Sequence, residues 1–287
     1  MTMTVPVPVQ NGIRSASRGL GLVTSAARLT PDFLIVGAQR CGTTSLYRTL
    51  VEHPAVLPAV LHKGVHYFDT AYTRSPRWYR GHFPLQATAR RTSARTGSRT
   101  ITGEASPYYM FHPAAPARIA HDLPDVKLIA LLRDPVERAY SAHTHERARG
   151  FEPLSFEEAL EAEEARLAGE DIRLLTDPGY VSHAHQHQAY VGRGRYVEQL
   201  ERMAGLVGRD RLLVLDADDF FADPHTGLAE VQRFLDLPQW QPARVEKRNA
   251  RPRAPMPAEL RSRLAAELEP WDERLAAWWG RTPSWRR

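Results

Sequence analysis

The sequence predicts a single α/β domain with a P-loop-like parallel β-sheet that is flanked by helices on both faces. From Phe33 onward, short apolar or β-branched runs alternate with longer helical patterns, which is typical of parallel strands joined by crossover helices. The run VKLIALL (126–132) is followed by Pro135, and proline fits best in the first turn of a helix. GAQRCGTT (37–44) places two glycines five residues apart, as a phosphate-binding loop requires.

The elements can be assigned in order along the chain. FLIV (33–36) predicts a buried strand, and a helix is expected from Thr43 to about Glu52. Further strands are expected at VHYF (65–68), TITGE (100–104), VKLIALL (126–132) and LLVLDADDF (212–220). Further helices are expected after Pro135 and at about 155–169, 187–205, 224–236 and 257–279. In such a sheet, ligands bind beyond the carboxyl ends of the strands.

Composition narrows the class of protein. The 287 residues are 43% hydrophobic and 25% charged, as in an ordinary globular protein. Cys41 is the only cysteine, so no internal disulfide is possible and we expect a cytoplasmic protein. No apolar run approaches the ~20 residues of a membrane span. Residues 1–31 contain no Asp or Glu; we interpret them as a flexible leader, with a targeting peptide as the alternative, and 32–287 as the domain.

The loop at 37–44 differs from that of a nucleoside-triphosphate enzyme. Such a loop has Lys where this chain has Thr43, and a later acidic residue that binds Mg²⁺. Here Arg40 stands two residues before the second glycine, and Asp134 is better explained as the cap of the helix that begins at Pro135. The loop therefore favours a group with less charge than a triphosphate, bound without a metal ion.

A second anion site is predicted after the strand at 126–132. Arg133 follows that strand directly, Ser141 lies two helical turns further on, and Arg138 shares the helix face of Ser141. A guanidinium group binds phosphate with a fork of donors, and a serine hydroxyl adds another. Two anion sites at adjoining strand ends suggest a ligand with phosphates at both ends of one nucleoside.

Four stretches together resemble the sulfotransferases that use 3′-phosphoadenosine 5′-phosphosulfate, above all the bacterial and heparan-sulfate-type members: GAQRCGTTSL, HKGVHYFD (62–69), GEASPYY (103–109) and LLRDPVERAYS (131–141). The resemblance implies that Arg133 and Ser141 hold the 3′-phosphate. It implies a 5′-phosphosulfate site at Arg40, Cys41, Gly42, Thr43, Thr44 and Ser45. A late basic segment matches loosely and offers Lys247, Arg248, Asn249 and Arg251.

The resemblance also implies an activity: transfer of a sulfuryl group to an acceptor hydroxyl of a small molecule, sugar or lipid. It implies no metal and no nucleic-acid partner, and it leaves the oligomeric state open. Two alternatives remain, a P-loop kinase-like enzyme and a non-catalytic nucleotide-binding relative. The second is motivated by Gly64, because heparan-type enzymes carry a catalytic Glu at the position of this glycine.

The missing carboxylate leaves the general base to be assigned. The candidates are His66, Glu104, Asp69 and Lys63. We expect His66 to project from a strand beside the vacant position and to take the acceptor proton, since imidazole titrates near neutral pH. Glu104 ends a predicted strand and is alternatively a structural partner. Arg40 is expected to stabilise charge on the departing phosphate.

Other features carry less weight. The histidines of HAHQH (183–187) are not accompanied by a carboxylate or thiolate set that would complete a metal site. Cys41 is expected to be a small residue packed under the loop. The basic stretch RRTSARTGSRT (90–100) is interpreted as a mobile surface loop, although an anionic polymer could dock there. Aromatic residues that could line an acceptor pocket are Trp78, Tyr79, Tyr108 and Tyr109.

Overall fold

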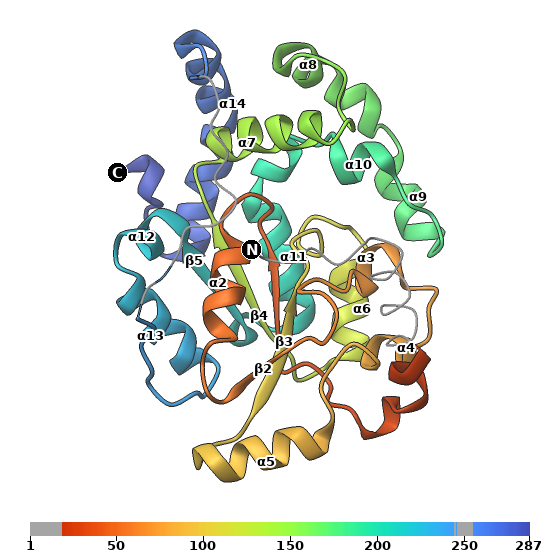
Figure 1. Cartoon of the computed structure of the whole chain (residues 1–287). Helices are drawn as coiled ribbons and strands as arrows, with labels where there is room; N and C mark the ends of the chain where they lie inside the picture. Colours follow the sequence, from red (N-terminus) through yellow and green to blue (C-terminus); the bar gives the residue numbers. More distant parts are fainter. Residues whose placement is uncertain (1–18, 244, 246–254) are drawn as a thin grey trace, which may run out of the picture.

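A computed structural model of the chain describes residues 19–243, 245 and 255–287. Its centre is a sheet of five parallel strands in the order β2-β3-β1-β4-β5 (Figure 1). The strands are β1 (Phe33–Gly37), β2 (Val56–Pro58), β3 (Ile101–Ala105), β4 (Lys127–Leu132) and β5 (Leu212–Asp216). The predicted α/β fold with a parallel sheet is confirmed.

The central strand β1 is buried along its whole length because helices cover both faces of the sheet. Its Ile35 pairs with Ala105 of β3 on one side and with Ile129 of β4 on the other. All five strands run in one direction, so the loops that leave β1, β3 and β4 emerge at the same edge. This edge positions the candidate site.

Helices connect and cover the strands. They are α2 (Thr43–Leu50), α3 (Tyr67–Thr70), α4 (Pro76–Arg80), α5 (Gln86–Thr96), α6 (Ala115–Asp122), α7 (Pro135–Ala148), α8 (Phe156–Leu167), α9 (Glu170–Thr176), α10 (His183–His187), α11 (Tyr196–Val207), α12 (Ala217–Ala222), α13 (Pro224–Phe234) and α14 (Ala258–Trp279). Helices α2 and α13 lie on one side of the sheet, whereas α6 and α11 lie on the other (Figure 1). Helices α7 to α10 form an arm above the strand ends.

The prediction of a strand at 65–68 is wrong. His66 has a left-handed backbone with φ of 56° and precedes the short helix α3, so Val65 and Tyr67 do not face one side of a strand. The backbone of 65–67 is held instead by tertiary hydrogen bonds from its amides, which override the local β-propensity. Strand β2, which begins at Val56, was not predicted because it is only three residues long.

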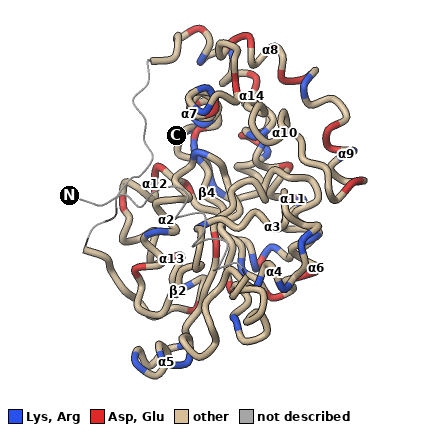
Figure 2. The backbone as a smooth tube through the Cα atoms, turned by 45° about the vertical axis from the view of Figure 1, so that its right-hand side comes forward, with Lys and Arg blue, Asp and Glu red and all other residues tan. Residues whose placement is uncertain are grey.

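Three further boundaries differ from the predictions. The expected strand at 212–220 ends at Asp216, whose side chain accepts hydrogen bonds from the amides of Asp218 and Asp219 and so caps α12. The expected helix at 187–205 begins only at Tyr196, after a 3₁₀ turn at Gly192–Gly194. The basic stretch 90–100, expected to be a loop, lies mostly in α5. Basic residues gather on α5, whereas α8 and α9 carry acidic ones (Figure 2).

The described residues of the expected leader are packed against the domain. Arg28 donates a hydrogen bond to the carbonyl of Phe83 at 2.6 Å, and the amide of Leu29 donates to Pro84 at 2.9 Å. Residues 19–31 therefore belong to the folded body, and residues 1–18 lie outside the described part. Among the described helices, none is both long and apolar enough to cross a membrane.

Candidate active site

A cavity of about 1070 Å³ opens at the carboxyl ends of the strands. Its walls come from the loop after β1, the segment at 59–66, the residues after β3 and β4, helix α7, and the turn at 186–193. These are the regions in which the sequence placed both anion sites and the candidate bases. The structure therefore brings sites that are far apart in the sequence into one pocket.

The loop after β1 is shaped to receive an anion. Gly42 caps α2 with φ of 92°, a conformation that favours glycine, and a Cβ at this position would meet the ring of Phe221 at 2.6 Å. Gly42, Thr43 and Thr44 line the cavity at the start of α2. The first N–H groups of a helix have no partner within it, so this end of α2 presents donors and the positive end of a dipole to the pocket. Thr43 and Ser45 are themselves buried.

Arg40 joins the two predicted anion sites. It lines the cavity and has φ of 70°, which is unfavourable for a residue with a side chain. Its Nε donates a hydrogen bond to Oγ of Ser141, which lies on α7, at 3.1 Å. The guanidinium group thus extends from the loop after β1 toward the helix that follows β4.

The residues of the second predicted anion site lie at the start of α7. Arg133 lines the cavity, and its carbonyl accepts a hydrogen bond from the hydroxyl of Tyr196 at 2.9 Å. Asp134 caps α7, since its Oδ1 accepts from the amides of Val136 and Glu137. The predicted cap is therefore confirmed, and this carboxylate is committed to the helix.

Arg138 does not belong to this site, although it shares a helix face with Ser141. Its side chain is fully buried and donates to the carbonyl of Tyr190. It neither lines the cavity nor lies on the surface.

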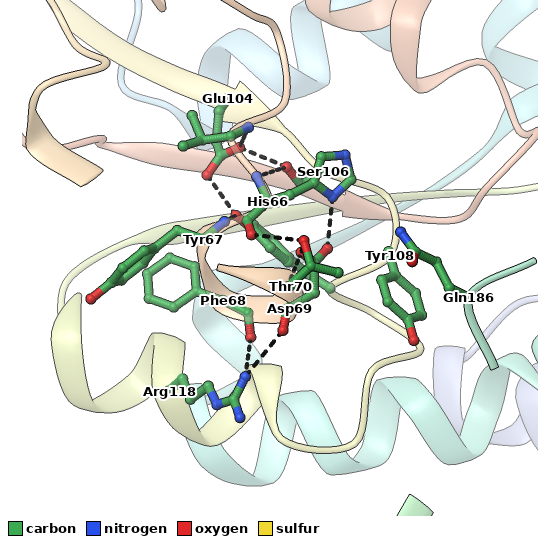
Figure 3. A network of polar contacts seen from close by, with 12 residues as sticks. His66, Tyr67, Phe68, Asp69, Thr70, Glu104, Ser106, Tyr108, Arg118 and Gln186 are labelled. Atoms are coloured by element: carbon green, nitrogen blue, oxygen red, sulfur yellow. Dashed lines mark hydrogen bonds and ion pairs between the residues drawn. The ribbon is translucent and has the colours of Figure 1, made fainter. Parts of the chain in front are cut away.

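Glu104 organises the opposite wall of the cavity (Figure 3). Its side chain is buried, and it accepts four hydrogen bonds. The donors are the amide of Val65 at 2.6 Å, Oγ of Ser106 at 2.7 Å, and the hydroxyls of Tyr79 at 2.8 Å and Tyr109 at 2.9 Å. Burial raises the pKa of Glu104, and these hydrogen bonds oppose the rise because they favour the ionised form.

His66 lines the cavity and pairs with Asp69. Its Nδ1 lies 2.8 Å from Oδ2 of Asp69; the histidine side chain is 42% exposed and the aspartate side chain 0%. Burial of the ring lowers the pKa of His66, but the charge of Asp69 and its hydrogen bond raise it, and the net direction is upward. The imidazole of His66 is thus accessible from the cavity, whereas its partner Asp69 is buried.

Lys63 and Gly64 complete this wall. Burial lowers the pKa of Lys63 to about 8, although nearby Glu104 opposes the shift. A Cβ at Gly64 would lie 2.6 Å from the carbonyl oxygen of Ala105 and 3.4 Å from Nε2 of His66. Glycine is therefore required at position 64 because the backbone at Ala105 lies so close, and the ring of His66 reaches the space beside it.

A second polar network links the loop after β1 to the arm. The amide of Gln39 donates to Glu146 at 3.2 Å and accepts from Arg193 at 2.6 Å. Glu146 is fully buried, and its Oε2 also lies 3.1 Å from Nδ1 of His187. Gln39, His187 and Arg193 all line the cavity, so the amide of Gln39 joins the loop after β1 to α7 and to the turn at 192–194.

The remaining predicted residues divide between the cavity and the core. Tyr108 lines the cavity, whereas Tyr79 and Tyr109 are core residues that support Glu104. Cys41 is packed under the loop, and burial raises the pKa of its thiol to about 11. Lys247, Arg248, Asn249 and Arg251 lie outside the described residues. No cluster of three or more His, Cys, Asp or Glu that could hold a metal is present in the described part of the chain.

Sequence reasoning missed several site residues. Gln39, Ser106 and Phe221 gave no signal because neutral side chains acquire their roles only from tertiary partners. The spacing of His66 and Asp69, three residues apart, was a signal that became interpretable only once 65–68 was known not to be a strand.

Comparison with known proteins agrees with this geometry. A family model described as the sulfotransferase domain matches residues 30–249. The chain is 31% identical over 215 residues to human bifunctional heparan sulfate N-deacetylase/N-sulfotransferase 3, covering 72% of this chain and 22% of the relative. It is 30% identical over 218 residues to human heparan sulfate glucosamine 3-O-sulfotransferase 3B1, covering 74% and 48%. The chain thus spans from about a fifth to a half of the length of these two relatives.

A solved structure extends the likeness to nearly the whole chain. The sulfotransferase from Alicyclobacillus acidocaldarius superposes with a TM-score of 0.66 at 29% identity, covering 90% of this chain and 100% of that one. The loop after β1, the Arg133 and Ser141 pair and the α/β sheet all lie within the matched region. The chain belongs to the sulfotransferase domain family.

Proposed function

We propose that this protein transfers a sulfuryl group from 3′-phosphoadenosine 5′-phosphosulfate to an acceptor hydroxyl. The observation that carries the proposal is the convergence of both predicted anion sites and the exposed ring of His66 in a single cavity. The loop from Arg40 to Ser45 is suited to the 5′-phosphosulfate, and Arg133 with Ser141 to the 3′-phosphate. Asp134 is occupied as a helix cap, which disfavours the kinase-like alternative.

The chemistry is an in-line displacement at sulfur. His66 Nε2 takes the proton of the acceptor hydroxyl as its oxygen forms a bond to sulfur. The bond between sulfur and the bridging phosphate oxygen breaks, and its electron pair stays on the phosphate. Arg40 and the N–H groups at the start of α2 stabilise that charge, which is where preorganised donors are most effective. The products are a sulfate ester and adenosine 3′,5′-bisphosphate.

The charged residues that line the cavity are mostly cationic. They include Lys63, Arg149 and Arg193, and the only carboxylate among the lining residues described is Asp218. Acceptors with hydroxyl groups on a polar scaffold, such as a sugar, fit this lining. The heparan sulfate named for two relatives is one such scaffold.

Nucleotide binding tests the two-site assignment. Adenosine 3′,5′-bisphosphate should bind more tightly than AMP by several kcal/mol, since each charge-assisted hydrogen bond contributes ~1.5–3 kcal/mol. Arg133→Ala or Ser141→Ala should remove most of this difference in calorimetry, while the affinity for AMP changes little. Equal affinity of the wild-type protein for both nucleotides would refute the proposal.

Turnover is tested with ³⁵S-labelled phosphosulfate donor and a panel of sugars, phenols and lipid extracts. Transfer of label to an acceptor in magnesium-free buffer supports sulfuryl transfer. Turnover that needs ATP and Mg²⁺ would favour a kinase instead. Tight bisphosphate binding with no transfer to any acceptor would support the non-catalytic alternative.

A further inference from the structure

We propose that two buried carboxylates, Asp69 and Glu104, position His66 as the base of the reaction and that neither of them takes the acceptor proton. Asp69 fixes the imidazole ring, and Glu104 fixes the backbone that carries it (Figure 3). This inference rests on the sulfuryl transfer proposed above. In this arrangement His66, held by Asp69 and by Glu104, takes the role of the glutamate that heparan-type enzymes carry at the position of Gly64.

Asp69 determines which ring nitrogen is available. An ionised carboxylate only accepts hydrogen bonds, so the contact of 2.8 Å places a proton on Nδ1 of His66. In the neutral ring, Nε2 then carries the lone pair. The other oxygen of Asp69 accepts from the amide of Thr70 at 2.5 Å and from its hydroxyl at 3.1 Å. Asp69 is thus held on both oxygens and has no exposed side-chain surface with which to reach an acceptor.

Glu104 fixes the backbone segment that carries the imidazole ring of His66. Three successive backbone amides, those of Val65, His66 and Tyr67, are tied to this one carboxylate. The first donates to it directly, the second donates to Oγ of Ser106 at 3.1 Å, and the third donates to the hydroxyl of Tyr109 at 2.8 Å. Both hydroxyls in turn donate to Glu104.

This arrangement stabilises a conformation that the chain would otherwise avoid. The φ of 56° at His66 lies in the left-handed region, which is unfavourable for a residue with a side chain. Arg118 adds support from α6, donating to the carbonyls of Phe68 at 2.9 Å and Asp69 at 3.3 Å. The strained residue is therefore the one that presents its ring to the cavity.

Glu104 itself is not placed to act as the base. Both of its oxygens already accept two hydrogen bonds, and it does not line the cavity. Taking a proton would require it to release at least one of these donors inside the core, which is costly for a buried polar group. His66, in contrast, lines the cavity and has an exposed ring.

The charges around His66 determine the pH dependence. Asp69 from α3 and Glu104 from β3 favour the protonated ring, whereas burial and Lys63 from the preceding segment oppose it; the ring edge of Tyr109 is uncharged. The pKa of His66 is raised in sum. A histidine base acts when neutral, so activity should fall as the pH decreases through this raised pKa.

Titration of His66 by NMR, with adenosine 3′,5′-bisphosphate bound, tests the role of Asp69. In the wild-type protein we expect the Nδ1–H tautomer and a pKa above the ordinary value. Asp69→Asn should lower this pKa by about one unit or more, the usual effect of losing an adjacent opposite charge. Asp218→Asn, which neutralises another acid in the same cavity, is the matched control and should leave the titration of His66 unchanged. An unaltered pKa and tautomer in Asp69→Asn would overturn the proposal.

The role of Glu104 is tested by pH–rate profiles of bisphosphate release from the phosphosulfate donor, with water as the acceptor. Ser106→Ala leaves Glu104 in place but removes the link to the His66 amide; it should lower the plateau by about tenfold or more without moving the acid limb. Glu104→Gln should also lower the plateau if it folds, and it should move the acid limb to lower pH, because the charge of Glu104 helps to raise the pKa of His66. An undiminished rate or a displaced acid limb in Ser106→Ala, which keeps the charge of Glu104, would show that Glu104 is not a positioning residue.

The two levels of the proposal fail differently. If the wild-type protein releases no bisphosphate and transfers no label, the proposed function fails, and the NMR titration still decides whether Asp69 controls His66. If transfer occurs but Asp69→Asn leaves the titration of His66 unchanged, the positioning fails and the proposed function stands.

Discussion

Replacing Gly64 tests whether the missing carboxylate could simply be restored. A Cβ at this position would lie 2.6 Å from the carbonyl oxygen of Ala105 and 3.1 Å from Oγ of Ser106. The first of these is a backbone atom at the end of β3, so it cannot move aside as a flexible side chain would. The amide of the same Ala105 donates to the carbonyl of Lys63 at 2.6 Å, which holds the two segments together.

The magnitude follows from this geometry. Gly64→Ala must separate two backbone segments that are joined by hydrogen bonds on either side of the glycine, from Ala105 to Lys63 and from Val65 to Glu104. Overpacking of this kind typically costs ~1–3 kcal/mol. In a domain of this size, each kcal/mol lowers Tm by about 2–4 °C.

Urea denaturation of Gly64→Ala against the wild-type protein measures the effect. We expect a lower midpoint with an unchanged m-value. Gly205→Ala is the matched control, because a Cβ at Gly205 would have no atom within 4 Å; it should stabilise α11 by about 0.5–1 kcal/mol. Gly64→Glu should be at least as destabilised as Gly64→Ala and should not restore activity to His66→Ala. A free energy of unfolding for Gly64→Ala within about 0.5 kcal/mol of the wild type would refute the steric argument.

Three further predictions concern other residues. Arg40→Ala and Arg40→Gly should both lower kcat by about 10²–10³, as when a preorganised donor is removed. The glycine variant should be more stable than the alanine variant by about 1 kcal/mol, because glycine adopts the φ of 70° without strain. Equal stability of the two variants in urea would contradict this. Cys41→Ser should keep turnover, since the buried thiol has no chemical role, and an inactive but folded variant would disprove that. Asp272→Asn should raise the free energy of unfolding at pH 7 by about 1–3 kcal/mol, because burial raises the pKa of Asp272 from 3.8 to about 6 and the fold disfavours its ionised form. This stabilisation should disappear as the pH falls through 6 toward 4. A stabilisation that persists at pH 4 would contradict this cause.

The sheet was largely predictable because four of its strands are buried on both faces. Runs such as FLIV at Phe33 and VKLIALL before Arg133 have no polar alternation, and their flanking glycine or proline marks where each strand ends. Strand β2 was missed because it is an edge strand of three residues that ends in Pro58. The pattern in the sequence reports burial: β2 is too short and too exposed to be recognised, whereas β5, the other edge strand, is mostly buried and was recognised.

The parts of the site that depend on backbone geometry could be predicted from the sequence, whereas the contacts between side chains could not. The loop from Arg40 to Gly42 was recognisable because glycine spacing reflects backbone geometry. The hydrogen bonds that converge on Glu104 come from three segments of the chain, at Val65, at Tyr79 and at 106–109, and no single local pattern encodes them. His66 was placed on a strand because its neighbours have high β-propensity, whereas tertiary hydrogen bonds decide its conformation.

The burial of Cys41 gives the donor loop an intrinsic reporter. The chain has no other cysteine, Cys41 is buried, and burial raises the pKa of its thiol to about 11, which leaves little thiolate at pH 7. Alkylation by a thiol reagent therefore requires the loop at 37–42 to open and expose Cys41, and the rate of alkylation measures how often this opening occurs. Adenosine 3′,5′-bisphosphate that binds over the loop should slow the alkylation in proportion to its occupancy, so that the mass shift on alkylation reports ligand affinity without an engineered label.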